Sequence, residues 1–330
     1  MTPPIVTVVG AGVTGARVAE AIAAMHAFRL AVVDNRPEVA ATVARVVSGV
    51  AVDVDLAEFS DGVVLAHPAP HAELAERLLE RRVPVVSMSD DIDDVNALLD
   101  LEPLTETVEV PLVIGAAMAP GLSGLLARHL AADLACVDEI HVAMHGTGGP
   151  ACARQHHRAL GGTSLALHDG EWIRRPAGAG RELCWFPEPV NAYDCYRAEM
   201  PEPILLHRVF PTARRMSARM SATRRDRFTA QMPMLSPPHK EGGVGAVRVE
   251  VRGALASGAR ETMIAGVSVR SGVAAAIVAA TMMRWVLTSD DRPNLVVLGD
   301  ERLPTRALLD DIQAAGVRLF EFTGVARSSE

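Results

Sequence analysis

Three glycines near the N-terminus carry the clearest chemical signal in the sequence. They stand in the pattern GxGxxG directly after the apolar, β-branched run at residues 5–9, and a helical pattern follows them. Gly10 permits a tight turn, Gly12 lets the backbone come close to a pyrophosphate, and Gly15 lets the helix lie against the strand. Free N–H groups at the start of that helix would then face the phosphates of a dinucleotide. The residues predicted to bind the phosphates are Gly10, Gly12, Val13, Thr14 and Gly15.

A second apolar run, at residues 30–33, ends at Asp34, about 20 residues after the glycine motif, where a dinucleotide site places the acid that binds ribose. A carboxylate there accepts hydrogen bonds from both ribose hydroxyls and repels a 2′-phosphate, so NAD is predicted ahead of NADP. The predicted ribose site also includes Asn35 and Arg36. NADP stays open because an arginine at this position can hold the 2′-phosphate, although it can also be an exposed loop charge. A glycine turn that binds nothing is the alternative, and the agreement of strand, turn, helix and acid argues against it.

A dense group of ionisable residues surrounds a second glycine-rich stretch, Gly146–Gly149. It consists of His145, Arg154, His156 and His157. A dehydrogenase needs a proton donor or acceptor near the carbon that exchanges hydride, and histidine is the usual one at neutral pH. A carboxylate-bearing substrate needs the fork of an arginine. We therefore predict His145, His156 and His157 as candidate catalytic residues and Arg154 as a substrate-binding residue.

The same residues also allow less specific interpretations. The histidines could lie incidentally on a surface loop, and at most one of the adjacent His156 and His157 should face a cleft. The acidic run at residues 89–94 could be a metal site, but acids behind a capping residue in the first turn of a helix explain it better. Cys152 fits a small core residue. We therefore predict no metal.

The elements that must position these residues alternate between strands and helices from residue 4 to about residue 114. Apolar runs at residues 5–9, 30–33, 62–66, 83–86 and 111–116 predict parallel strands, and the helical patterns between them include one at residues 90–101. In such a sheet the ligand lies outside the carboxyl ends of the strands, so the loops there should share a cleft. These loops add Ala66, His67, Pro68 and Ser87 to the predicted cofactor site, and Met118 and Gly121 to the predicted substrate site.

The character of the chain changes near residue 122. Strand-like segments at residues 139–145, 214–218, 245–253 and 261–269 are separated by connections rich in proline and glycine, which is typical of a mostly antiparallel sheet. An apolar helix at residues 272–287 is expected to pack back on the first domain. The predicted fold is α/β, with a doubly wound parallel Rossmann sheet at residues 1–122, an inserted α+β domain at 123–270, and a C-terminal segment at 271–330 that returns to the first domain.

Composition and charge narrow the function classes. The chain has 330 residues, of which 49% are hydrophobic and 4% aromatic, and this fits a buried α/β core built on small aliphatic side chains. The formal net charge of -8 argues against nucleic-acid binding. There is no signal-peptide pattern, no CxxC pair among the four cysteines, and no apolar run of about 18 residues free of charges and turn residues. We expect a cytoplasmic chain with no membrane span, and a homodimer stays open.

Several of these features together resemble the saccharopine dehydrogenase-like oxidoreductases. They are the strand-GAGVTG-helix, Asp34, a proline-rich turn after the 62–66 strand, and Ala119-Pro120-Gly121-Leu122 opening a helix; residues 139–162 look like actinobacterial members. The resemblance implies a Rossmann domain, an inserted α/β domain, a returning C-terminal helix and an imine or secondary-amine substrate of amino-acid type. The turn at residues 67–71 also partly resembles the Gfo/Idh/MocA oxidoreductases, but Ser87-Met88-Ser89 stands where their catalytic lysine would be.

These patterns predict a nicotinamide-dependent oxidoreductase that moves hydride to or from a small carboxylate-bearing substrate. The amine or imine character of that substrate is what the resemblance implies. Two alternatives stay open. One is a regulatory or scaffold protein that binds a dinucleotide without turnover, because no clear catalytic dyad is visible. The other is a dehydrogenase of a sugar or polyol hydroxyl.

Overall fold

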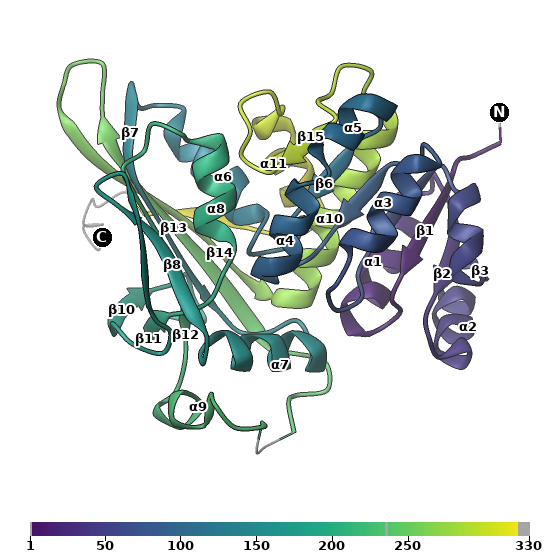
Figure 1. Cartoon of the computed structure of the whole chain (residues 1–330), viewed down its shortest axis with the longest axis horizontal. Coiled ribbons are helices and arrows are strands. Elements are labelled where there is room, and N and C mark those ends of the chain that lie inside the picture. The colour runs from purple at the N-terminus through teal and green to yellow at the C-terminus, as the bar shows by residue number, and fades with distance from the viewer. Residues whose placement is uncertain (1, 235–236, 323–330) are drawn as a thin grey trace, which may run out of the picture.

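The computed structural model describes residues 2–234 and 237–322 and arranges them around two β-sheets (Figure 1). Within these ranges the first sheet has seven parallel strands in the order β3-β2-β1-β4-β5-β6-β15. Their bounds are β1 (Ile5–Val9), β2 (Arg29–Val33), β3 (Val50–Ala51), β4 (Gly62–Leu65), β5 (Val85–Ser87), β6 (Leu112–Ile114) and β15 (Leu295–Val297). The strand order reverses between β1 and β4, which confirms the predicted doubly wound Rossmann sheet.

Helices cover both faces of this first sheet. Helices α1 (Val13–Ala23) and α10 (Ser271–Thr288) contribute to the apolar cluster on one face. The other face is covered by α3 (Ala72–Glu80), α4 (Ile92–Leu99) and α5 (Glu102–Val108), and α2 (Pro37–Val46) and the 3-10 helix η1 (Val54–Phe59) complete this part of the chain. Helix α4 matches the helix predicted at residues 90–101. Asp91 caps it as expected, since its carboxylate accepts the N–H groups of Asp93 and Asp94, whereas α5 was not predicted.

The second sheet is mixed, with the order β10-β11-β12-β7-β13-β14-β16, and β8 pairs with β12 and β9 beside this path. Its strands are β7 (Cys136–His145), β8 (Thr163–His168), β9 (Glu171–Pro176), β10 (Glu182–Trp185), β11 (Ala192–Arg197), β12 (Arg215–Ser221), β13 (Val244–Ala254), β14 (Arg260–Arg270) and β16 (Leu319–Glu321). The four strands predicted for this domain correspond to β7, β12, β13 and β14. The sequence did not predict β8 to β11, because strands such as β9 are mostly exposed and lack an apolar run.

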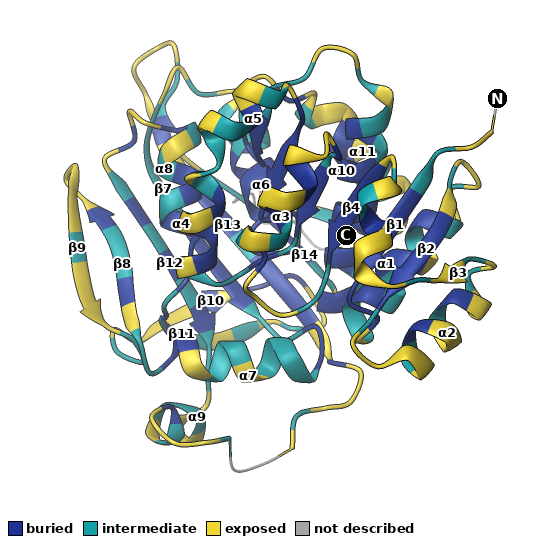
Figure 2. Ribbon diagram, turned by 45° about the vertical axis from the view of Figure 1, so that its right-hand side comes forward, coloured by how far each residue is buried: buried dark blue, intermediate teal, exposed yellow. Residues whose placement is uncertain are grey.

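Side chains of the second sheet alternate between two different faces. On β7, Ile140, Val142 and Met144 belong to the main apolar core. His141 and His145 occupy the alternate positions of the strand, so they point to the opposite face. Helix α6 (Leu122–Ala131) packs on the apolar face against β7, β13 and β14. Figure 2 shows that buried residues run through the central strands of both sheets.

Helix α10 is a central packing element. It has 18 residues and a mean hydropathy of 1.4, so by length and composition it could cross a membrane, contrary to the expectation from sequence. In the structure 78% of this stretch is buried inside the protein, where α10 packs against α1, β4 and β5. It is therefore a core helix here, and the prediction that it returns to the first domain is confirmed.

The rest of the C-terminal segment divides between the two sheets. Strand β15 extends the first sheet beside β6, and α11 (Thr305–Ala314) packs on α10 and α6. Strand β16, in contrast, pairs antiparallel with β14 in the second sheet, and residues 323–330 lie outside the described residues. One apolar cluster includes residues of both sheets, so the boundaries proposed near residues 122 and 270 stay predictions.

Candidate functional site

The glycine loop between β1 and α1 has the geometry that its spacing predicts. Gly10 has a φ of +97°, and a Cβ there would lie 2.6 Å from the backbone nitrogen of His67. A Cβ on Gly15 would overlap the carbonyl oxygen of Gly10, so only glycine allows helix and strand to meet this closely. A Cβ on Gly12, in contrast, meets no atom within 4 Å. The loop therefore leaves open space over Gly12 beside the N–H groups of the first turn of α1.

The second glycine-rich stretch lies against the same helix start. A Cβ on Gly148 would lie 3.1 Å from Oγ1 of Thr14, and one on Gly149 would lie 3.0 Å from Cβ of Val13. Gly149 is the N-cap of helix α7 (Pro150–Ala159). The starts of α1 and α7 are therefore neighbours, and the two stretches that the sequence predicts to bind cofactor and substrate adjoin in space.

Asp34 ends β2 beside the glycine loop, and both of its carboxylate oxygens are engaged. Oδ2 accepts the N–H of Ala11 at 2.8 Å, and Oδ1 accepts the backbone N–H and the Nε–H of Arg36 at 3.0 Å and 3.1 Å. Burial raises the pKa of Asp34, but the hydrogen bonds from Arg36 and Ala11 outweigh burial and lower the pKa from its ordinary value. The carboxylate is therefore ionised next to the loop, and the exposed Asn35 and Arg36 lie at its rim.

A buried histidine holds the loop that follows β4. Nε2 of His71 lies 2.8 Å from the carbonyl oxygen of His67, so Nε2 carries the proton, and Nδ1 accepts from Oγ of Ser87 at 2.8 Å. Burial lowers the pKa of His71 to about 4, so the ring is neutral at neutral pH. The backbone N–H of His71 donates to Oδ1 of Asp94 at 2.8 Å. These bonds join the ends of β4 and β5, where the predicted cofactor residues Ala66, His67, Pro68 and Ser87 lie.

A pocket lies between the carboxyl end of the first sheet and the second domain. Its walls come from the loops after β5 and β6, from α7, β7 and β12, and from the segment that leads into helix α8 (Glu202–Val209). Its polar lining consists of Asp90, Gln155, His156, Glu199 and Glu202, and its apolar lining of Ala119, Met144, Ala159, Met200, Pro201 and Met220. The cavity itself is small, with a volume of about 10 Å³ that holds about one water molecule, so it marks the place where polar groups converge and is not an open substrate cavity.

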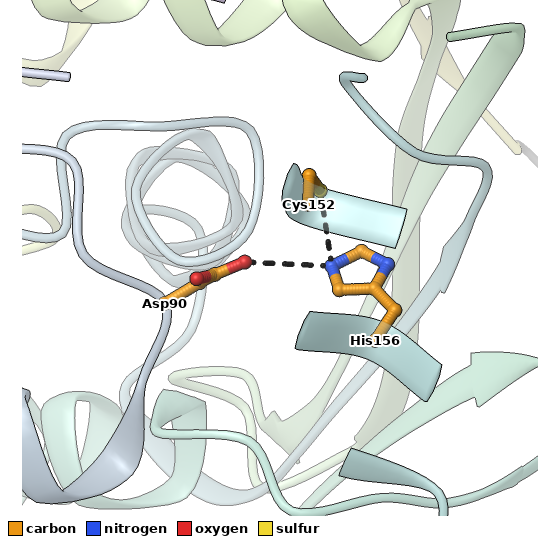
Figure 3. A group of neighbouring side chains, drawn as sticks. All are labelled: Asp90, Cys152 and His156. Atoms are coloured by element: carbon orange, nitrogen blue, oxygen red, sulfur yellow. Dashed lines mark hydrogen bonds and ion pairs between the residues drawn. The ribbon is translucent and has the colours of Figure 1, made fainter. Parts of the chain in front are cut away.

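Three side chains of this region converge on one point (Figure 3). Nε2 of His156 lies 3.5 Å from Oδ2 of Asp90 and 3.4 Å from Sγ of Cys152. Cys152 and His156 are four residues apart on α7 and share one face of the helix, whereas Asp90 follows β5 of the first sheet. Both contacts fall on the same ring nitrogen. In a nucleophile–base–acid triad the nucleophile and the carboxylate use opposite nitrogens of the imidazole, so this group is not such a triad.

Two ionisable groups of the pocket have displaced pKa values. Burial lowers the pKa of His156, but the interactions with Cys152 and Asp90 outweigh burial and raise that pKa well above its ordinary value. Glu202 is 1% exposed, and neither of its carboxylate oxygens has a hydrogen-bond partner among the described residues. Burial raises the pKa of Glu202 to about 7. Displaced pKa values in a cleft are typical of acid–base sites.

The structure separates the histidines that the sequence groups together. His145 ends β7 on the face opposite Met144, which lines the pocket. Its Nδ1 lies 2.8 Å from Oγ of Ser221, and its ring lies on that of Tyr193 with centroids 4.1 Å apart. Burial lowers the pKa of His145. His145 and His156 therefore do not share a site.

The remaining predicted residues are divided between the pocket and other surroundings. Of the adjacent histidines only His156 lines the pocket, while Nε2 of His157 lies 3.0 Å from the carbonyl oxygen of Met232. Arg154 is exposed and lies outside the pocket lining. Met118 is buried in the core, and Gly121, at the start of α6, lines a second small cavity next to Glu202. Roles for these residues stay predictions.

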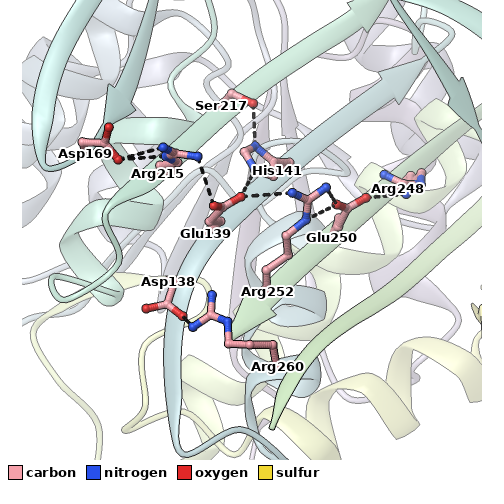
Figure 4. Close-up of polar contacts among 10 residues, drawn as sticks. All are labelled: Asp138, Glu139, His141, Asp169, Arg215, Ser217, Arg248, Glu250, Arg252 and Arg260. Atoms are coloured by element: carbon pink, nitrogen blue, oxygen red, sulfur yellow. Dashed lines mark hydrogen bonds and ion pairs between the residues drawn. The ribbon is translucent and has the colours of Figure 1, made fainter. Parts of the chain in front are cut away.

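The far face of the second sheet carries a separate network of charges (Figure 4). Glu139 lies 3.4 Å from Arg215 and 3.3 Å from Arg252. Glu250 lies 2.6 Å from Arg248 and also pairs with Arg252. Since each of these carboxylates has arginine partners, the network fits a structural role on the sheet surface better than a role in chemistry.

Of the polar residues in the pocket region, sequence reasoning assigned only His156 and missed Asp90, Cys152, Gln155, Glu199 and Glu202. One signal was available, because a cysteine and a histidine four residues apart share a face if the segment is helical. Asp90 lies one residue before the capping residue Asp91. Helix capping therefore explains the acidic residues that follow Asp90 but not Asp90 itself. No sequence pattern marks Glu202, whose burial depends on how α8 packs.

Comparison with curated proteins finds a relative in sequence. No family model matches the chain. Myo-inositol dehydrogenase Hyg17 from Streptomyces leeuwenhoekii is 30% identical over 197 residues, which is 58% of this chain. The match spans 60% of the length of that protein.

Solved structures show the same fold over almost the whole chain. Apo saccharopine dehydrogenase (L-Glu forming) from Saccharomyces cerevisiae matches with a TM-score of 0.73 at 13% identity, over 97% of this chain and 100% of that chain. GenD2 from gentamicin A biosynthesis, in complex with NAD, matches with a TM-score of 0.50 at 17% identity, over 98% of this chain and 97% of that one. At these identities the likeness concerns the fold. The chain therefore has the saccharopine dehydrogenase-like fold, in which a Rossmann sheet is joined to a second, mixed sheet.

Proposed function

We propose that this chain is an NAD-dependent oxidoreductase that acts on a small polar substrate. The observation that carries the proposal is the loop Gly10–Gly15, which leaves space over Gly12 beside the free N–H groups of α1 and the ionised Asp34. The likeness in fold to saccharopine dehydrogenase and to NAD-bound GenD2 supports it, as does the similarity to an inositol dehydrogenase.

The residues around this loop fit a dinucleotide. The N–H groups of Val13 and Thr14 would hold the pyrophosphate, Asp34 the ribose hydroxyls, and the linked loops after β4 and β5 would border the nicotinamide. When bound, the nicotinamide supplies a hydride donor or acceptor at C4. NADP is the second candidate. Arg36 could bind a 2′-phosphate, but it would first have to break the hydrogen bond that it now donates to Asp34.

The role of the protein's own residues is to orient the substrate and to move a proton. We propose His156 as the proton carrier, because it is the histidine of the predicted group that lines the pocket and its pKa is raised. Asp90, 3.5 Å from Nε2, would orient the ring and stabilise its charge. Glu202 is a second acid–base candidate, since its pKa of about 7 lets it gain or lose a proton near neutral pH.

The pocket lining favours a substrate that carries hydroxyl or ammonium groups. Carboxylates of Asp90, Glu199 and Glu202 can accept hydrogen bonds from such groups, and no arginine or lysine in the described ranges lines the pocket. A carboxylate-bearing amino-acid substrate, which the family resemblance implies, would need Arg154 to reach in from its exposed position. We therefore place hydroxyl- or amino-bearing polyols first, and amino acids of the amine or imine type second. A cytoplasmic location and a homodimer stay predictions.

A substrate panel tests this proposal. NAD and NADP would be offered with cyclitols, amino-cyclitols and sugars, and NADH and NADPH with keto acids plus amines, following absorbance of the reduced nicotinamide. We expect turnover with a polyol or amino-polyol, and none in a Gly12→Val control. Tight NADH binding without turnover of any compound would instead favour a non-catalytic dinucleotide-binding protein. Turnover restricted to keto acids with amines would restore the amino-acid substrate.

A further inference from the structure

We propose that Asp90, Cys152 and His156 form a binding site for one divalent transition-metal ion, with zinc as the best match. The ligands would come from both parts of the chain, Asp90 from the loop after β5 and the other two from α7. The site does not depend on the oxidoreductase activity proposed above. It also departs from the prediction of no metal, which rested on the acidic run at residues 89–94 and on the interpretation of Cys152 as a small core residue.

The two distances from Nε2 of His156 to the other donor atoms fit neighbouring ligands of a tetrahedral ion. One carboxylate oxygen, Sγ and Nε2 all lie within 4.8 Å of one another, and Nε2 is 3.4 Å from Sγ and 3.5 Å from Oδ2 (Figure 3). With zinc–ligand bonds of about 2.0–2.3 Å, neighbouring ligands of a tetrahedral site lie roughly 3.3–3.8 Å apart. The donor types agree with the spacing, because thiolate and imidazole suit zinc, whereas magnesium and calcium prefer oxygen ligands alone.

The direction of the contacts is compatible with a metal site. Cys152 and Asp90 both approach Nε2 of His156, and a single proton on that nitrogen can be well aligned with only one of them. A cation placed among the three donors would contact all of them. Cys152 and His156 stand four residues apart on α7, the same spacing with which two histidines of one helix bind zinc in other proteins.

Glu202 gives an independent indication of a cation in this region. It lines the same pocket as Asp90 and His156, it is 1% exposed, and both of its carboxylate oxygens lack a hydrogen-bond partner in the described part of the chain. A buried carboxylate without a partner is costly to ionise, and a nearby divalent cation would offset that cost. A bound cation nearby would favour the ionised form of Glu202, which would then add negative charge to the site.

Two consequences follow if zinc occupies this site. Nε2 of His156 cannot bind zinc and carry a proton at the same time, so zinc should inhibit any turnover that uses His156. Zinc would also tie the loop after β5 to α7, next to the existing bond from Nε2 of Gln155 to Oδ2 of Asp91 at 2.9 Å. Binding should therefore raise the melting temperature.

Metal titration of the full chain tests the proposal without reference to activity. Protein freed of metal with a chelator would be titrated with Co²⁺, and Zn²⁺ would then be added to displace it. We expect one equivalent to bind with a sulfur-to-cobalt charge-transfer band and with release of the thiol proton. Cys152→Ser should lose the band. His156→Gln and Asp90→Asn should each weaken zinc binding by more than about 100-fold, because loss of a direct ligand costs more than the roughly 10- to 100-fold lost with a residue that only hydrogen-bonds to a ligand.

Matched variants separate this site from adventitious binding. Cys136→Ser, His157→Gln and Asp93→Asn change the same residue types outside the site and should keep both the band and the zinc affinity. Absence of a charge-transfer band in the wild-type chain, or a band that survives in Cys152→Ser, would overturn the proposal. If one of the three ligand variants fails to fold, as judged by circular dichroism, the zinc and cobalt binding of the other two variants tests the proposal. A chain that binds cobalt here but oxidises no substrate would refute only the proposed function.

Discussion

A carboxylate oxygen of Asp90 lies 3.5 Å from Nε2 of His156, although Asp90 follows a strand of the first sheet and His156 lies on a helix of the second domain. The start of that helix already adjoins the start of α1, because Gly149 packs on Val13. The glycine loop and the polar pocket therefore lie along the same edge of the first sheet. Rossmann sheets bind their ligands at this edge, so cofactor and substrate can meet there.

Replacing Gly12 with valine should abolish dinucleotide binding and leave the fold intact. A side chain at this position meets no protein atom within 4 Å, so it would fill only the space proposed for the pyrophosphate. Gly12 is also the N-cap of α1, where valine is disfavoured, so a loss of about 1 kcal/mol in stability is expected. Fluorescence titration with NADH should show at least 100-fold weaker binding, and Gly12→Ala an intermediate loss. Unchanged affinity in the valine variant would remove the phosphate-loop assignment.

Replacing Asp34 with serine should shift the cofactor preference toward NADP. The change removes the negative charge that would repel a 2′-phosphate, and it releases Arg36 from its hydrogen bond at 3.1 Å. Loss of charge-assisted bonds to the ribose should weaken NAD binding by about 10- to 100-fold. Isothermal titration with both cofactors measures the ratio, and Arg36→Ala in the serine background should remove any gain in NADP affinity. An unaltered ratio would mean that the carboxylate does not touch the ribose.

The three histidines predicted from sequence should differ sharply in their effect on turnover. His156→Gln should lower kcat by about 100-fold or more, because it removes the proposed proton carrier from the pocket. His145→Gln and His157→Gln should stay within about threefold, because neither residue lines the pocket. Steady-state kinetics with chelator present measures all three. A large loss in His145→Gln alone would move the active site to the opposite face of the second sheet.

Glu202 should make the protein less stable as the pH rises. Its folded pKa of about 7 exceeds the ordinary value of 4.5, so between these pH values the folded chain retains a proton that the unfolded chain releases. Stability therefore falls across this window, by an amount on the order of 3 kcal/mol, and levels off above it. In Glu202→Gln this loss should disappear, so the variant should be more stable than wild type at pH 8 and similar near pH 5.

Thermal unfolding at both pH values, with chelator present, measures this difference. Glu80→Gln changes an exposed glutamate at the end of α3 and should follow the wild-type pH dependence. If Glu202→Gln follows the wild type as well, the carboxyl group does not titrate in the folded protein as its burial implies.

The first sheet could be predicted from the sequence because its signals are local. Each strand is a short apolar run, each helix follows within a few residues, and the glycine pattern specifies one turn. The second sheet was harder to predict. Strands such as β9 expose most of their residues and so lack an apolar run, and β16 joins the second sheet through pairing with β14, about 50 residues earlier in the chain.

The candidate site shows the same limit at the level of single residues. The adjacency of His156 and His157 predicts that one of them at most faces a cleft, and of the two only His156 lines the pocket. The sequence could not show that the pocket opens on the apolar face of β7, the face of Met144, so that His145 is directed away from it. Nor could it show that Asp90 and Cys152 meet at one nitrogen of His156, because they lie more than 60 residues apart.

The sequence by itself determined the dinucleotide loop, its acid and the parallel sheet that holds them, because these depend on spacing within a few tens of residues. Only the tertiary structure decided which histidine enters the pocket, which carboxylates accompany it and how deeply Glu202 is buried. The physical reason is that direction and burial of a side chain depend on the packing of α7 and α8 against the edge of the first sheet. That packing is made by contacts between distant segments, and no local pattern encodes it.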